Sequence, residues 1–165
     1  MRTKKTFSLL ILFTLLCSIN VCAQTKIVTG HPDFKIKITR CEASGSTAVI
    51  DFLLENVGND DVKISMYGGN EQDSKSVAYD DEGNKFGGKK FQIAISGSGL
   101  TAYSLGEILP PDVPLKARIQ IEGVPESATE FKRVDLQLYC NTWNLNRDKK
   151  PVRFTNVPIS REGDE

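Results

Sequence analysis

The sequence predicts an all-β protein, an immunoglobulin-like antiparallel β-sandwich of about eight to nine strands. Short segments in which apolar and polar residues alternate recur along the 165 residues. Clusters of Gly, Pro, Asn and Asp separate these segments, as turns do between strands. No eleven-residue window shows the 3.6-residue apolar period that is typical of an amphipathic helix.

The strand pattern is clearest in the run STAVIDFLLENVGND. Ile50, Phe52 and Leu54 alternate with polar residues, which indicates one buried face. Val49 and Leu53 are apolar as well, so we expect the other face to be partly covered. A strand of this kind belongs in the middle of a sheet.

Similar alternating segments precede and follow this strand in the sequence. The polar stretch 67–76 has too few apolar residues to bury itself and is expected to be a surface loop. The prolines of 109–114 prevent regular pairing and indicate a crossover or a sheet edge. The other expected strands are 34–39, 62–66, 77–79, 85–86, 91–95, 103–105, 115–122, 131–139 and 152–157. The residues expected to form one core are Ile50, Phe52, Leu54, Ile119, Ile121, Leu136 and Leu138.

The N-terminus predicts export. Residues 1–23 combine basic residues, an apolar core and small residues before Gln24, the pattern of a cleaved signal peptide. The apolar core is too short for a membrane span, so no span is expected in the mature form. The mature chain then divides into an N-terminal arm at 24–32, the sandwich at 33–159 and a flexible tail at 160–165. The expected location is periplasmic, cell-surface or secreted.

The charge balance argues against nucleic acid as a partner. The whole chain has 21 basic and 21 acidic residues. Cleavage before Gln24 would remove three basic residues and no acidic ones, leaving a net charge near −3. Nucleic-acid-binding proteins instead show a basic excess.

Two cysteines stay in the mature chain. An even pair in an exported protein favours a disulfide, here between Cys41 and Cys140. Cys140 continues the inward series of its strand, whereas Cys41 is out of phase, so the bridge requires a bulge near Thr39 or Arg40. The alternative is two unpaired, buried thiols.

No cofactor or metal site is expected. Two cysteines and the single His31 are too few ligands for a soft-metal centre. The acidic turn at 80–84 lacks the alternate ligands and distal glutamate of an EF-hand loop, so we interpret it as a solvated hairpin turn.

Several segments together resemble a known family. The turn at 56–58, the strand at 62–66, the run AYDDEGNKF at 78–86 and the run IQIEGVP at 119–125 are similar to bacterial secreted immunoglobulin-like domains of unknown function, which are related in fold to a mycobacterial immunogenic secreted antigen. This resemblance spans residues 34–125. It implies an exported, non-catalytic envelope or surface module and transfers no catalytic residue.

The residues themselves favour binding over catalysis. With one histidine beside Pro32, no nucleophile, base and orienting group combine in a recognisable pattern. We therefore expect a non-catalytic module that binds a protein or glycan partner at the envelope or surface. The alternative is a carboxylate-dependent extracellular hydrolase, because acidic residues are plentiful.

Two polar segments with an aromatic residue are the candidate ligand contacts. The loop that begins at Tyr67 includes Asn70, and the second segment includes Trp143 and Asn144. A tryptophan among asparagines suits sugar stacking or a partner surface. The alternative is that Trp143 covers the end of the core.

Overall fold

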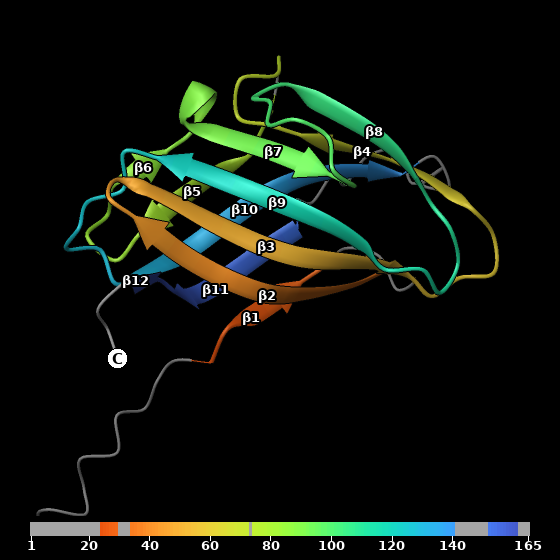
Figure 1. The fold of residues 1–165 in the computed structure, drawn as a ribbon, viewed down its shortest axis with the longest axis horizontal. Coiled ribbons are helices and arrows are strands. Elements are labelled where there is room, and N and C mark those ends of the chain that lie inside the picture. The colour runs from red at the N-terminus through yellow and green to blue at the C-terminus, as the bar shows by residue number, and fades with distance from the viewer. Residues whose placement is uncertain (1–23, 30–33, 73, 141–151, 162–165) are drawn as a thin grey trace, which may run out of the picture.

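The computed structural model describes residues 24–29, 34–72, 74–140 and 152–161 of the chain. It confirms the predicted immunoglobulin-like β-sandwich, in which two sheets lie face to face (Figure 1). The strands pair antiparallel, with one exception at a chain end. None of the helices in the described residues is long and apolar enough to cross a membrane.

The first sheet is built around one long strand, β10. Its main path runs β1 (Lys26–Val28), β11 (Val152–Pro158), β10 (Glu130–Cys140), β4 (Val62–Tyr67) and β8 (Ser104–Leu109). Two further strands, β5 (Val77–Asp80) and β6 (Lys85–Phe86), extend from β10 beside this path.

The second sheet runs β12 (Ser160–Arg161), β2 (Phe34–Ser44), β3 (Thr47–Asn56), β9 (Leu115–Glu122) and β7 (Phe91–Ile95). A single turn of 3₁₀ helix, η1 (Gly88–Lys90), precedes β7. The run STAVIDFLLENVGND supplies β3, which lies between β2 and β9 as its pattern predicts.

The core lies between the sheets and contains every residue predicted for it. Along β3, Ile50, Phe52 and Leu54 are buried, and the alternate residues are half-buried. The ring of Phe52 meets that of Phe154 on β11, with centroids 5.6 Å apart, and so joins the two sheets. The partly covered outer face expected from Val49 and Leu53 is confirmed.

The first hairpin is tighter than predicted and contains the expected bulge. Strand β2 continues to Ser44, so the connection to β3 is only Gly45 and Ser46. The pairing of β2 with β3 shifts register between Ile38 and Arg40, where the bulge was predicted. The shift returns Cys41 to the buried face.

The predicted disulfide is wrong in this structure, because Cys41 and Cys140 are free, buried thiols. The bulge turns Cys41 inward, but it does not bring the two residues together. Strand β2 runs toward its hairpin with β3, and β10 runs toward the opposite end of the sandwich (Figure 1). Cys41 therefore lies near one end of the second sheet, while Cys140 ends β10 at the other end of the first sheet.

Both chain ends contribute more structure than expected. Lys26–Val28, within the expected arm, forms β1 and pairs with β11. Ser160–Arg161, within the expected tail, forms β12 and pairs parallel with Glu42 and Ala43 of β2. The Arg161 guanidinium donates to the carbonyls of Gly45 and Pro125, which fixes this end to two turns.

The proline-rich segment is the crossover that its composition predicts. It leads from β8 at the edge of the first sheet to β9 in the second. Buried Asn56 fixes the start of the proline-rich segment. Its Nδ2 donates to the carbonyl of Leu109 at 3.1 Å and also to the carbonyl of Asp60 at 2.8 Å. The Asp112 N–H in turn donates to the Asn56 carbonyl at 2.9 Å.

Candidate functional site

The most distinctive surface feature lies where β10 changes its partner. The first half of β10 pairs with β5, where Asp135 lies opposite Val77. The second half pairs with β4, where Gln137 lies opposite Tyr67. Strands β4 and β5 thus lie on the same side of β10, and the chain between them, the 68–76 loop, leaves the sheet and returns to it.

Backbone hydrogen bonds fix the outgoing part of the 68–76 loop. The N–H groups of Gly68 and Asn70 donate to the carbonyls of Tyr103 at 2.6 Å and Ala102 at 2.9 Å. A Cβ atom at Gly68 would lie 2.4 Å from the carbonyl carbon of Ala102. Glycine is therefore required where the loop passes the neighbouring backbone.

Side chains of Ser76 and Gln137 close the gap between the two strands. Ser76 Oγ donates to the Tyr67 carbonyl at 2.6 Å and accepts from the Gln137 N–H at 2.9 Å. Gln137 Oε1 accepts from the Lys75 N–H at 2.7 Å, and Nε2 donates to the Tyr139 hydroxyl at 2.7 Å. These hydrogen bonds take the place of the strand-to-strand hydrogen bonds that are missing where β10 changes its partner. Buried backbone N–H and C=O groups need such partners.

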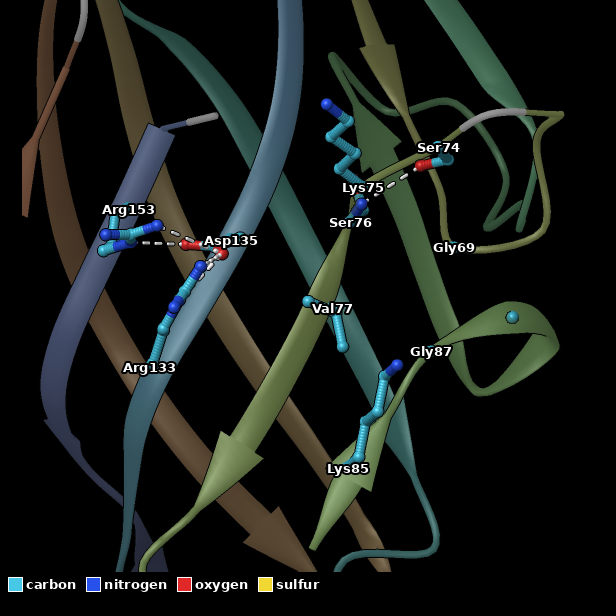
Figure 2. A pocket seen from close by; sticks show the side chains of 11 residues that line it. Gly69, Ser74, Lys75, Ser76, Val77, Lys85, Gly87, Arg133, Asp135 and Arg153 are labelled. Carbon is cyan, nitrogen blue, oxygen red and sulfur yellow. Dashed lines mark hydrogen bonds and ion pairs between the residues drawn. The ribbon is translucent and has the colours of Figure 1, made fainter. Parts of the chain in front are cut away.

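A hollow with a volume of about 440 Å³ lies beside this break on the outer face of the sheet. We call it the split-sheet pocket (Figure 2). Its walls come from the 68–76 loop, from β5 and β6 with the start of η1, and from β10 and β11. It is lined by Gly69, Ser74, Lys75, Ser76, Val77, Lys85, Gly87, Gly88, Arg133, Asp135 and Arg153.

One wall carries a carboxylate held by two arginines. Asp135 accepts from Arg153 Nε at 2.7 Å and from Arg133 Nε at 2.8 Å, and Arg133 Nη2 also bonds to it. The side chain of Asp135 is 3 % exposed, against 45 % for Arg133 and 40 % for Arg153. Burial opposes ionisation of Asp135, but the hydrogen bonds and charges of both arginines outweigh it and lower its pKa.

The opposite wall carries two lysines. Lys75 lies near the end of the 68–76 loop and Lys85 lies on β6, and both side chains are exposed. Figure 2 shows them across the pocket from the arginine pair. Within the described part of the chain, neither ammonium group has a carboxylate partner.

A second arginine-flanked carboxylate lies on the other sheet and is charge-balanced. Asp51 on β3 accepts from Arg118 Nε at 2.7 Å and from Arg40 Nη2 at 2.6 Å. Arg40 also pairs with Glu42 at 3.1 Å. The hydrogen bond from Arg118 is the main cause of the lowered pKa of Asp51. Here two arginines face two carboxylates.

The residues predicted as ligand contacts have different outcomes. Tyr67 is the last residue of β4, Asn70 lies in the 68–76 loop, and both are half-buried. The ring of Tyr67 meets that of Tyr139 edge-on, with centroids 4.9 Å apart, so one side of it is occupied. Trp143 and Asn144 lie outside the described residues, as does His31.

Sequence reasoning found the loop but missed the charged wall of the pocket. The alternation of Arg133 and Asp135 with apolar residues was a usable signal for one outward-facing pair on β10. Nothing in the sequence indicates that Arg153 lies opposite Asp135, because that depends on the register of β11 against β10.

The acidic turn at 80–84 has a structural role. Asp80 is buried, and its carboxylate accepts from the N–H groups of Glu82 and Asn84 and from Asn84 Nδ2 at 2.8 Å. This is the arrangement of an Asx turn that joins β5 to β6. In the described residues, no three His, Cys, Asp or Glu side chains gather as metal ligands.

Comparisons with known proteins include two solved structures whose similarity to this chain is low. No family model and no curated protein matches the chain. The solved structure of an ASH/PapD-like domain of human CEP192, PapD-like domain 7, is 18 % identical over 87 % of this chain and 94 % of that chain, with a TM-score of 0.37. The N-terminal domain of PorA is 10 % identical over 85 % and 98 %, with a TM-score of 0.39.

The fold assignment therefore rests on the strand order and pairing of this chain. The resemblance to secreted bacterial immunoglobulin-like domains has no support from these comparisons and stays a prediction.

Proposed function

We propose that this protein is an exported, non-catalytic immunoglobulin-like module that binds a protein or glycan partner at the cell envelope or surface through the split-sheet pocket. Immunoglobulin-like sandwiches present loops to partners on a rigid scaffold. Here the loop that the sequence singles out forms a wall of the pocket.

The observation that carries this proposal is the concentration of polar side chains at the break in the first sheet. Residues from five separate parts of the chain line the pocket, and the hydrogen bonds of Ser76 and Gln137 fix the end of the 68–76 loop to β10. A pre-formed hollow with a few convergent polar groups is the usual form of a binding site.

The same geometry does not favour the hydrolase alternative at this pocket. A carboxylate hydrolase needs two carboxyl groups that face each other across a cleft, about 5 to 10 Å apart. Asp135 is the one carboxylate among the lining residues, and both of its oxygens accept from arginines. Its lowered pKa makes it a poor proton donor near neutral pH.

Capture of partners from native envelope extract tests the proposal. Val77→Glu places a carboxylate in the pocket, where it can pair with the cationic wall and fill the space. Val49→Glu is the matched control, because Val49 is also half-buried and on an outer strand face. We expect the Val77 variant to lose the captured species and the control to keep it.

Equal capture by the wild type and the Val77 variant would place the contact elsewhere. Loss on Trp143→Ala instead would assign the contact to the second predicted segment. Hydrolysis of a captured glycan would overturn the non-catalytic part of the proposal.

Export has its own test. Fractionation of the native cells should recover the protein outside the cytoplasm, and its N-terminal residue should be Gln24. A protein that stays in the cytoplasm with residues 1–23 attached would contradict this part of the proposal.

A further inference from the structure

We infer that the split-sheet pocket is an anion site that takes an oxyanion group, a carboxylate or a phosphate, between its arginine and lysine walls. This inference rests on the proposed function in placing the partner at this pocket, and it adds the chemistry by which the partner is recognised.

The first argument is local charge. Four cationic side chains line the pocket, namely Lys75, Lys85, Arg133 and Arg153, and Asp135 is the one carboxylate among them. The pocket thus has a surplus of three positive charges, although the whole chain has equal numbers of acidic and basic residues. A concave surface lined by one sign of charge concentrates counter-ions of the other sign.

The second argument is that the two arginines have hydrogen-bond donors that Asp135 does not use. Each arginine bonds to Asp135 through Nε and Nη2. In the described structure, Nη1 of Arg133 and Nη1 of Arg153 have no hydrogen-bond partner, and both guanidinium groups reach solvent. Asp135 therefore orients two guanidinium groups without using all their donors, which lowers the entropy lost on binding an anion.

The third argument is space. Three of the residues that line the pocket are glycines, Gly69, Gly87 and Gly88, which leave space that larger side chains would fill. The volume of about 440 Å³ accommodates a carboxylate or phosphate together with part of the group that bears it. Ammonium groups on one wall and guanidinium groups on another can supply charge-assisted hydrogen bonds to an anion in the pocket.

The cluster around Asp51 shows that arginine–aspartate pairing alone does not create this surplus. Arg40 and Arg118 are matched there by Asp51 and Glu42. It offers a control with the same chemistry and no excess of charge.

The test is a titration of the purified full chain with acetate, citrate, phosphate and sulfate, each replacing chloride at constant ionic strength. Backbone amide resonances of Val77 and Gly87 report on the pocket, and those of Asp51 and Arg118 report on the control cluster. We expect saturable shifts at Val77 and Gly87 with a Kd of about 1 to 10 mM for at least one anion. Saturation by acetate or citrate assigns a carboxylate, and saturation by phosphate or sulfate assigns a tetrahedral oxyanion.

Variants make the result specific to the pocket. Lys75→Gln with Lys85→Gln removes two exposed charges and leaves the Asp135 cluster intact, so we expect this variant to fold as the wild type does. We expect about tenfold weaker anion binding in this double variant and less than about twofold change in Arg118→Gln. Equal weakening in both variants, or no saturation up to ~50 mM of any anion, would overturn the inference.

Failure of the inference differs from failure of the proposed function. Partner capture that is lost with Val77→Glu but retained in the double lysine variant, together with no anion saturation, would leave the function and remove the anion site. Saturable anion binding without any captured partner would leave the anion site and remove the function.

Discussion

The Ser76 hydroxyl accepts a hydrogen bond from the backbone N–H of Gln137 at 2.9 Å, at the point where β10 passes from β5 to β4. A side chain thus performs the role of a strand neighbour inside a sheet. The same hydroxyl donates to the carbonyl of Tyr67, the last residue of β4. One serine therefore links all three strands at the break.

Ser76→Ala is expected to lower the free energy of unfolding by about 1 to 3 kcal/mol, because it removes the acceptor of the buried Gln137 N–H and the hydrogen bond that Ser76 donates to the Tyr67 carbonyl. Chemical denaturation of the variant measures this loss. Ser104→Ala on exposed β8 is the control, expected to change stability by less than about 0.5 kcal/mol. Equal effects of the two substitutions would show that Ser76 does not stabilise the break.

Gly68→Ala is expected to destabilise the protein by about 1 to 3 kcal/mol, since the new Cβ would lie 2.4 Å from the Ala102 backbone and force the loop to move. Gly99→Ala is the matched control, because a Cβ there meets nothing within 4 Å. Thermal unfolding of both variants gives the comparison. A Gly68 variant as stable as the Gly99 variant would mean that the loop does not pass this close to its neighbour.

The Asp135 cluster predicts a defined loss of stability in acid. Its folded pKa is lowered, so its contribution is fully present above the unfolded pKa of about 4 and is lost as pH falls through the folded pKa. Asp135→Asn should lower stability at pH 7 by about 1 to 3 kcal/mol, less than for a fully buried pair because both arginines reach solvent.

Between pH 5 and 3, Asp135→Asn should then lose less further stability than the wild type. Urea denaturation at each pH measures both curves. Parallel curves for the two proteins would contradict the lowered pKa of Asp135.

The two thiols are expected to be slow to react in the folded protein. Burial raises the pKa of Cys41 and of Cys140 to about 12, and Glu42 adds to the effect at Cys41. At pH 8 only about one thiol in ten thousand is then ionised. Mass spectrometry after iodoacetamide treatment should show no addition to Cys41 or Cys140 in native buffer and addition to both in denaturant, without reductant. If both residues resist alkylation in denatured, unreduced protein, the two cysteines form a disulfide and this prediction is wrong.

The strands that the sequence predicts best are those in which buried and exposed positions alternate regularly. Strand β9 has the predicted bounds, 115–122, because its inward residues are apolar and its outward residues polar without a break. The bulge before Cys41 was predictable for the same reason, as a change of phase. Strands β1 and β12 were missed, because they have only three and two residues, too few to show an alternating pattern. They form through pairing with β11 and β2, which are distant in the sequence.

The candidate pocket was predictable in part. The polar composition of residues 67–76 identifies the loop, but not that it covers β10. Alternation places Asp135 on the outer face, where an isolated strand would expose it to water. Its burial instead depends on Arg133, on Arg153 from the adjacent strand and on the register between β10 and β11, which the local sequence does not determine.

The position of β10 also constrains the order in which the chain can fold. Strands β4, β5 and β11 all pair with it, and β1 joins only through β11, where Lys26 lies opposite Thr155, 129 residues away. A chain still being synthesised can close the β2–β3 hairpin early, but most of the first sheet must wait until the β10 segment is available. Such non-local pairing predicts a high contact order and folding in milliseconds to seconds rather than microseconds. Until then β4 and β5 lack their central neighbour, and their exposed edges are open to pairing with other chains.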